Sequence, residues 1–239
     1  MQFNHWIHFF NSNAGHFHHF RFTDDHAIDE VERRIIERSL QQFQHGEQSE
    51  GKNLFRYAKG FDSDGYLKAI VPFIREEQDH AMILGKFMER NGIERIKGHW
   101  VNEVFRGLRR FAGLEMSITV LLTAETIAAV YYKALGRATS SDDLRRICED
   151  ILRDEEMHIN FQSYTINLLQ RDRSWLHRKC LRYAHQFLMA GTIVVVYAGH
   201  RRVLRAGGYT AWQFAREVQR EFMRADAMIL GQRSMATVH

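Results

Sequence analysis

The chain has 239 residues, a formal net charge of +4, two cysteines and a single proline. Its length suits one large domain, and its hydrophobic and aromatic contents of 45% and 12% exclude a disordered protein. Because proline breaks helix interiors, its near-absence favours long helices over a loop-rich all-β fold. Two cysteines are too few for a disulfide scaffold, and no secretory signal is recognisable, so we expect a cytoplasmic protein.

The first part of the chain is expected to hold an arm and two long helices. Residues 1–24 contain five histidines and several aromatic residues, and we predict an irregular arm there. One helix is predicted from about 25 to 59, and a second from about 66 to 90, where Asn91-Gly92 ends it. The segment FDSDG at 61–65 separates the two helices, and Pro72 is expected to kink the second one.

The remainder is expected to hold four more long helices. Residues 93–113 form a connection with a short helix at 100–111, and a third long helix is predicted at 114–135. Ser140 or Ser141 caps a fourth helix that reaches about residue 170. Two further helices are predicted near 174–206 and 210–230. The longest apolar run, 187–199, is shorter than the roughly 17–25 residues that span a bilayer, so we expect a buried helix and no membrane span.

Two Glu-x-x-His segments carry the strongest chemical signal, one from Glu77 to His80 and one from Glu155 to His158. Residues three apart share one face of a helix, so each pair can offer a carboxylate and an imidazole to one metal ion. With 17 glutamates and 14 histidines in the chain, about one such pair is expected by chance. A Glu-x-x-His segment alone therefore does not identify a metal site, and the residues on the other helices decide its meaning.

Each of the other two long helices places one glutamate on an otherwise apolar stripe. Glu47 and Glu125 each lie 30 residues before the glutamate of a Glu-x-x-His segment. Adding 78 to the numbers of Glu47, Glu77 and His80 gives Glu125, Glu155 and His158. Four buried carboxylates need positive charge between them, which two divalent ions supply. One Glu from each of two helices plus Glu-x-x-His from each of two others is a dinuclear ligand pattern of helix bundles. The alternative is that the apolar stripe lies on a different face of its helix than we infer, and that Glu47 or Glu125 is a surface residue.

With these motifs, the sequence resembles the ferritin-like di-iron carboxylate superfamily over roughly residues 26–170. The stretch ILRDEEMHI at 151–159 is similar to the fourth helix of bacterioferritins, and EEQDH at 76–80 is similar to the EExxH motif of the soluble acyl-carrier-protein desaturases. The resemblance implies an all-α protein with a ferritin-like four-helix bundle and a dinuclear metal site at 25–170. The arm at 1–24 precedes it, and two additional helices at 171–239 pack on it as a C-terminal extension.

The six candidate ligands are expected to differ in role. We expect Glu77 and Glu155 to bridge or chelate the metal ions. The expected terminal ligands are Glu47, Glu125, His80 and His158. Glu50 lies one turn beyond Glu47 on the same stripe. It is expected to be an extra ligand or a proton carrier, or to replace Glu47 if the phase of the helix differs.

Further residues are expected to support these ligands. Imidazole ligands normally donate their other N–H to a carboxylate. By resemblance to bacterioferritins, Asp154 is expected to orient His80. Glu76 lies 78 residues earlier and is expected either to serve His158 in the same way or to be an exposed helix residue. Further residues are expected either to be plain core residues or to line a nearby pocket that excludes water, and they are Phe43, Phe73, Leu84, Leu121, Tyr132 and Ile151.

The resemblance implies an oxidoreductase that uses two iron ions, two manganese ions or a mixed pair to activate O2 or peroxide and to oxidise a small apolar substrate. Gln78 stands where bacterioferritin has its haem-ligating methionine, so no haem is predicted. No G-x-G-x-x-G fingerprint predicts a flavin or nucleotide, so electrons are expected from an external donor. The alternatives are an iron-handling or peroxide-scavenging ferritin- or rubrerythrin-like protein, and a non-catalytic metal-binding bundle.

The charge distribution bears on the partners of the protein. Residues 161–239 contain 12 Lys/Arg against 4 Asp/Glu. This excess indicates either a solvated helix face or a surface for an anionic partner, such as an acidic carrier protein, RNA or a membrane. No interleaving of aromatic and basic residues favours nucleic acid. The resemblance to the oxidoreductase members of the superfamily also leads us to expect a homodimer.

Overall fold

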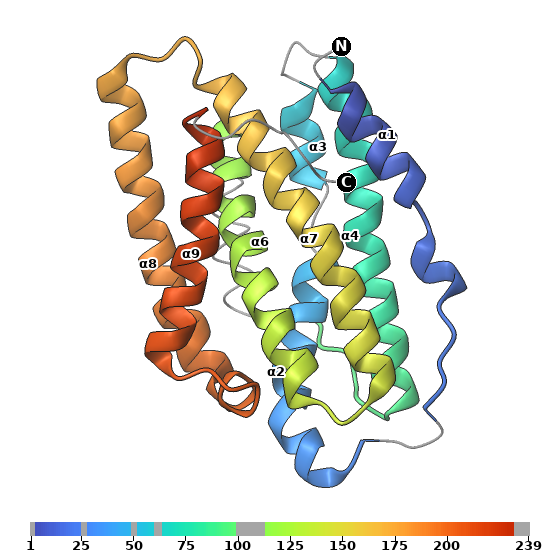
Figure 1. Ribbon diagram of the computed structural model, residues 1–239. Coiled ribbons are helices and arrows are strands. Elements are labelled where there is room, and N and C mark those ends of the chain that lie inside the picture. Colours follow the sequence, from blue (N-terminus) through green and yellow to red (C-terminus); the bar gives the residue numbers. More distant parts are fainter. Residues whose placement is uncertain (1–2, 25–27, 49–51, 60–63, 99–112, 232–239) are drawn as a thin grey trace.

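The computed structural model describes residues 3–24, 28–48, 52–59, 64–98 and 113–231, which form helices and connections without a strand. Figure 1 shows long helices lying side by side. The helices of the first part are α1 (Asn4–Asn13), the short 3-10 helix η1 (His16–His19), α2 (Glu30–Gln48), α3 (Lys52–Ala58) and α4 (Asp64–Arg90). Those that follow are α6 (Gly113–Ala138), α7 (Asp142–Leu169), α8 (Trp175–Ala206) and α9 (Ala211–Ile229). The all-α prediction is confirmed for the described residues.

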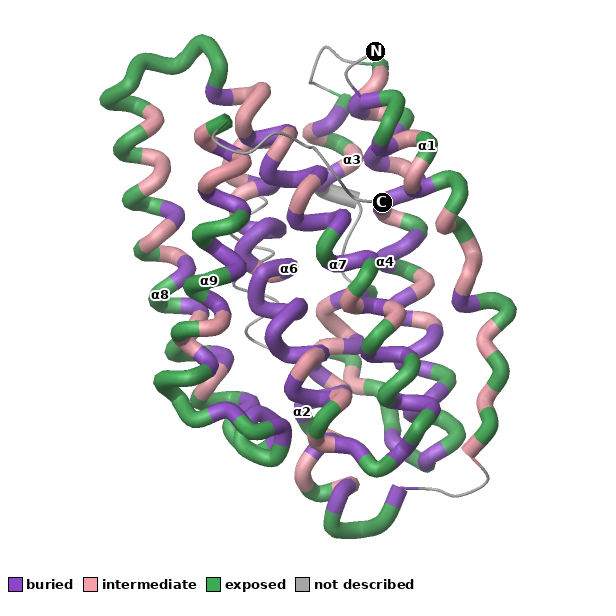
Figure 2. Tube along the Cα trace, in the orientation of Figure 1, coloured by how far each residue is buried: buried purple, intermediate pink, exposed green. Residues whose placement is uncertain are grey.

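Helices α2, α4, α6 and α7 form a bundle. Helix α6 packs along α7 and α2 packs along α4, while contacts of α4 with α7 and of α2 with α6 join the two pairs. The sides that face one another are buried and the outward sides are exposed (Figure 2). Ile36, Leu84, Leu121 and Ile151 are examples of the apolar side chains between these helices. The apolar stripes of the sequence therefore meet in a shared core.

The helix boundaries agree with the prediction in α4, α6 and α7 and differ in α2. Helix α4 runs through Pro72 as one helix. The side chain of Ser141, rather than that of Ser140, caps α7 by accepting a hydrogen bond from the backbone N–H of Leu144. The helix predicted over 25–59 begins at Glu30, and its described parts are α2 and α3. Glu50 and the short helix predicted at 100–111 lie outside the described residues.

The prediction of an irregular arm is wrong for residues 4–13, which form α1. Phe3, Trp6 and Phe10 are buried and follow helical spacing, so they lie on one face of this helix. The ring of Phe10 contacts the rings of Phe73 in α4 and Phe161 in α7. Helix α1 thus packs on α4, and its buried aromatic side chains reach the junction of α4 and α7.

Helices α8 and α9 pack on α6 and α7 and lie on the side of the bundle away from α1 (Figure 1). Ser174 and Thr210 cap the two helices, and the Gly207-Gly208 turn joins them. A Cβ at Gly207 would lie 2.2 Å from the carbonyl oxygen of Ala134 in α6, so only glycine allows this close approach. The turn therefore fixes the end of α8 against α6.

The prediction of a buried helix at 187–199 is wrong for one face of α8. Phe187 and Val194 are 83% and 68% exposed, whereas Met189 and Val196 face the bundle and are buried. Helices α6 and α8 are both long and apolar enough to cross a membrane by length and composition alone. In the most apolar 18-residue stretch of α6, 67% is buried, which is typical of a core helix. In the corresponding stretch of α8, only 33% is buried.

Candidate metal centre

Six buried side chains from four helices meet inside the bundle. One comes from the last turn of α2, two from α4, one from α6 and two from α7. They are Glu47, Glu77, His80, Glu125, Glu155 and His158, and none is more than 7% exposed. These are the six residues that the repeat in the sequence singles out. They form two groups that could each hold a metal ion.

The first group consists of Glu47, Glu77, His80 and Glu155, whose ligand atoms lie within 4.8 Å of one another. His80 turns Nδ1 toward this group, 4.0 Å from Glu47 Oε2 and 3.9 Å from Glu155 Oε1. The hydroxyl of Tyr132 donates a hydrogen bond of 2.5 Å to Glu47 Oε1 and so orients this carboxylate. The group offers three carboxylates and one imidazole nitrogen to a cation.

The second group consists of Glu77, Glu125, Glu155 and His158, within the same 4.8 Å limit. His158 Nδ1 lies 2.8 Å from Glu77 Oε1 and 3.7 Å from Glu125 Oε2. Glu77 and Glu155 belong to both groups, and Glu155 turns Oε1 toward His80 and Oε2 toward the second histidine. The two groups are therefore adjacent and share the two carboxylates expected to bridge.

The outward nitrogens of both histidines meet buried carboxylates. His80 Nε2 lies 3.0 Å from Asp154 Oδ2, and His158 Nε2 lies 2.7 Å from Glu76 Oε2. These are the two pairs predicted from the sequence, the first by resemblance to bacterioferritins and the second by the offset of 78 residues. A carboxylate can only accept a hydrogen bond, so each Nε2 carries a proton and each Nδ1 points to the carboxylate groups. Such partners fix the orientation of an imidazole ligand.

Asn13, at the end of α1, joins the two outer carboxylates. Its side-chain amide donates hydrogen bonds to Glu76 Oε1 and, at 2.7 Å, to Asp154 Oδ1. His16 Nε2 from η1 lies 3.3 Å from Asp154 Oδ2. The arm is therefore part of the site. Sequence reasoning missed Asn13 because a single asparagine in the arm belongs to no motif and no helical period.

Aromatic rings cover both histidines. Phe17 of η1 makes an edge-to-face contact with His80, with ring centroids 5.6 Å apart. Phe10 and Phe73 contact the ring of His158, at 6.0 and 4.6 Å. All three phenylalanines are buried. The histidines and carboxylates therefore lie in a dry environment in which charge interactions are strong.

Burial and mutual repulsion perturb the proton affinity of the cluster. Burial and then the charge of Glu77 raise the pKa of Glu47 well above its usual value, and burial and then Glu125 do the same for the pKa of Glu155. Although burial opposes it, hydrogen bonds from Glu155 and His158 lower the pKa of Glu125. Burial by itself would lower the pKa of His158, but the surrounding carboxylates, Glu77 foremost, outweigh it and raise this pKa well above its usual value. The raised pKa values show that the crowded carboxylates favour a nearby positive charge, which either a proton or a metal cation can supply.

The donor set fits divalent metal ions. Within the described part of the chain, Glu155 meets another carboxyl group, that of Glu125, but no N–H or alcohol donates a hydrogen bond to it, and His80 Nδ1 has no hydrogen-bond partner. Such buried polar atoms cost free energy unless they are paired. Carboxylates and imidazoles together suit iron or manganese, and the set does not distinguish between them. A pair of cations would satisfy these atoms.

A third group, His16, Glu76 and Asp154, has ligand atoms close enough for a metal ion, but its carboxylate oxygens already accept the hydrogen bonds described above. His18 lies 3.1 Å from Asp79 on the surface. Within the described residues, the other arm histidines, His5, His8 and His19, belong to none of the groups that could hold a metal.

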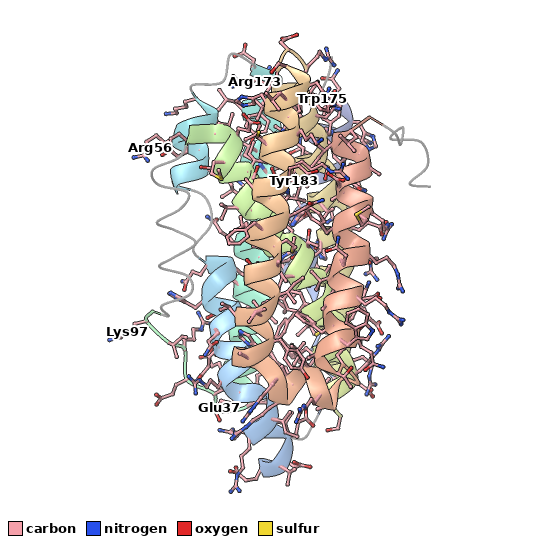
Figure 3. The ribbon with its side chains drawn as sticks, turned by 90° about the vertical axis from the view of Figure 1, so that its left-hand side faces the viewer. Glu37, Arg56, Lys97, Arg173, Trp175 and Tyr183 are labelled. Carbon is pink, nitrogen blue, oxygen red and sulfur yellow. The ribbon has the colours of Figure 1, made fainter. Side chains whose placement is uncertain are left out.

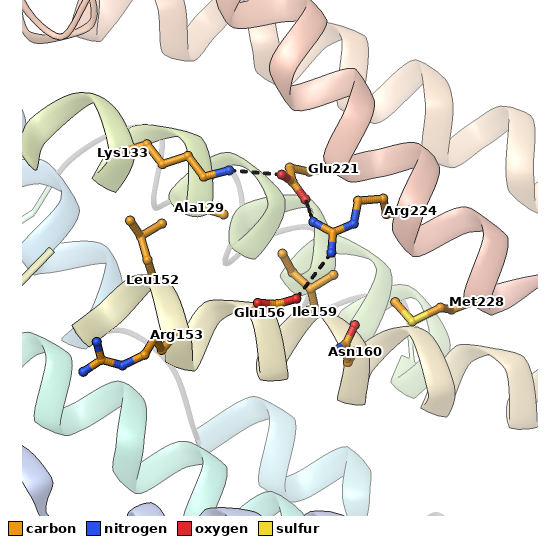
Figure 4. Close-up of a pocket in the computed structure, with 10 residues that line it drawn as sticks. All are labelled: Ala129, Lys133, Leu152, Arg153, Glu156, Ile159, Asn160, Glu221, Arg224 and Met228. Carbon is orange, nitrogen blue, oxygen red and sulfur yellow. Dashed lines mark hydrogen bonds and ion pairs between the residues drawn. The ribbon is translucent and has the colours of Figure 1, made fainter. Parts of the chain in front are cut away.

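A pocket of about 270 Å³ lies between α6, α7 and α9 (Figure 4). Ala129 and Ile159, one turn beyond Glu125 and Glu155, are among its lining residues. Ion pairs link Lys133 to Glu221, Glu221 to Arg224 and Arg224 to Glu156 (Figure 4). The residues predicted to wall the site do not line this pocket. Five of them are buried core residues, and Phe43 stacks on Tyr131. Their role beside a substrate stays a prediction.

No protein-family model matches the chain, and no curated protein matches it.

Proposed function

We propose that the protein is an oxidoreductase with a dinuclear iron or manganese site of the ferritin-like type. The observation that carries the proposal is the pair of buried groups that share Glu77 and Glu155 and each receive one histidine Nδ1. When bound, two such ions supply redox equivalents and Lewis acidity for the reduction of O2 or peroxide. Electrons come from an external donor, and a small apolar compound is the proposed substrate.

The side chains of the chain itself do three things in this proposal. Asp154 and Glu76 hold the histidine rings with Nδ1 inward. Tyr132 holds the carboxylate of Glu47 at one end of the site. The phenylalanines over the histidines exclude water, which protects reactive species from side reactions.

The proposal is tested by loading the protein with Fe(II) without oxygen and then admitting air. We expect about two ions per chain, which reoxidise with a change in the ultraviolet spectrum. Glu155→Gln should lose most of the metal. Glu156→Gln is the matched control, because the next residue is exposed and should keep the full metal content. Equal metal content in both variants would refute the ligand assignment.

The same experiment separates the alternatives. Continued uptake of iron far beyond two ions per chain would indicate an iron-handling protein. Rapid peroxide consumption without an organic product would indicate a scavenger. A bound metal that does not reoxidise in air would indicate a non-catalytic bundle.

A further inference from the structure

Helix α8 presents an apolar face that the described remainder of the chain leaves uncovered. Figure 3 shows the helix running along the front of the molecule, with Trp175 and Tyr183 at its upper part. The exposed large side chains of this face follow helical spacing along the whole helix. They are Leu176, Tyr183, Phe187 and Val194.

The residues between these side chains are small and leave the face open. Ala184, Ala190 and Ala198 are exposed, and a Cβ added at Gly191 would meet no atom within 4 Å. Residues 183–200 contain no Asp, Glu, Lys or Arg, which corresponds to about 27 Å of helix without charge. Continuous exposed apolar surfaces of this kind mark contact sites for proteins or membranes.

The charges at the ends of this face all have one sign. Helix α8 contains no acidic residue. Exposed Lys179 lies near its start, and exposed Arg201, Arg202 and Arg205 continue the same side at its end. The ammonium of Lys179 lies over the ring of Trp175, 4.8 Å from its centroid. An uncharged centre is therefore flanked by cations at both ends.

This charge pattern distinguishes the possible occupants. If a second copy packed α8 along α8, parallel or antiparallel, cations would meet cations, with no acid on either helix to pair with them. An anionic bilayer surface accepts the apolar face among its acyl chains and the cations among its phosphates. Tryptophan and tyrosine are also enriched at the boundary between membrane and water.

The packing of α8 decides its orientation toward a membrane. Helices α2, α6 and α9 contact its inner side, where Met189, Val196 and Val203 are buried. A helix attached to the bundle in this way cannot cross a bilayer without unfolding the protein. We propose that the protein binds peripherally to anionic lipid bilayers, with the exposed face of α8 lying in the plane of the membrane surface. This inference does not depend on the metal site.

The test uses the full chain and two kinds of vesicle, one of phosphatidylcholine and one of phosphatidylcholine mixed with phosphatidylglycerol. In flotation, we expect the protein to rise with the anionic vesicles and to be released in part by high salt. Phe187→Glu should weaken binding at least about tenfold, since it places a charge at the centre of the face. Val31→Glu is the matched control, because Val31 is 70% exposed on α2, and this variant should bind as the unaltered protein does.

Three results would overturn the proposal. The first is no flotation with either vesicle. The second is an equal effect of the two substitutions. The third is a dimer in light scattering that Phe187→Glu dissociates, because a second copy would then cover the face. Equal thermal unfolding of the two variants shows that a loss of binding is not a loss of fold.

Discussion

Asn13 offers a sharp test of the idea that the arm completes the metal site. Its amide donates hydrogen bonds to Glu76 and Asp154, which in turn hold the two histidines. Asn13→Ala removes both bonds. Loss of a direct hydrogen-bond partner of a ligand typically weakens metal binding 10- to 100-fold, and Asn13 lies one contact further out. Because Asn13 is partly exposed, water can replace the amide in part. We therefore expect the lower end, about tenfold or about 1.4 kcal/mol.

The assay is competition for Mn(II) between the protein and a chelator of known affinity. Asn11→Ala is the matched control, since Asn11 is an exposed asparagine of the same helix. This control should bind Mn(II) as the unaltered protein does. Thermal unfolding of the metal-free proteins shows whether α1 still packs. Unchanged affinity in Asn13→Ala, with the helix intact, would refute a positioning role for this residue.

Three more predictions follow from the geometry. Tyr132→Phe removes the hydrogen bond to Glu47, so competition titration should show weaker binding of one of the two ions only. Because the pKa values of Glu47 and Glu155 are raised, protons compete with metal, so affinity should fall as the pH is lowered and loading should release protons to a pH indicator. Gly207→Ala should lower the free energy of unfolding by about 2 kcal/mol or more in urea titration, because its Cβ would overlap the backbone of α6, whereas Gly199→Ala, in open space, should not.

The bundle and the six buried residues that meet inside it could be predicted because both depend on periodicity. A buried helix needs an apolar stripe, and a charged residue on that stripe is unexpected unless it has a partner. The common offset of 78 residues between the two sets of three residues was a second regularity, which a random placement of glutamates and histidines rarely produces. Asp154 could be placed by the resemblance of its helix and Glu76 by the same offset, and the structure puts both against the histidines.

The arm and α8 could not be predicted in the same way. In α1, the spacing of Phe3, Trp6 and Phe10 was the available signal, but three aromatics do not show which groove they fill. In α8, an apolar run indicates burial in general, whereas exposure depends on how many neighbours surround the helix. Asn13 acts through two residues that are 63 and 141 positions away, a relation that no local pattern encodes.

The most direct test of the central claim is anomalous diffraction from crystals grown with Mn(II). The account predicts two peaks per chain between Glu77 and Glu155, one facing His80 Nδ1 and the other facing His158 Nδ1. A single peak, or metal bound only at the arm histidines while these carboxylates hold none, would contradict it.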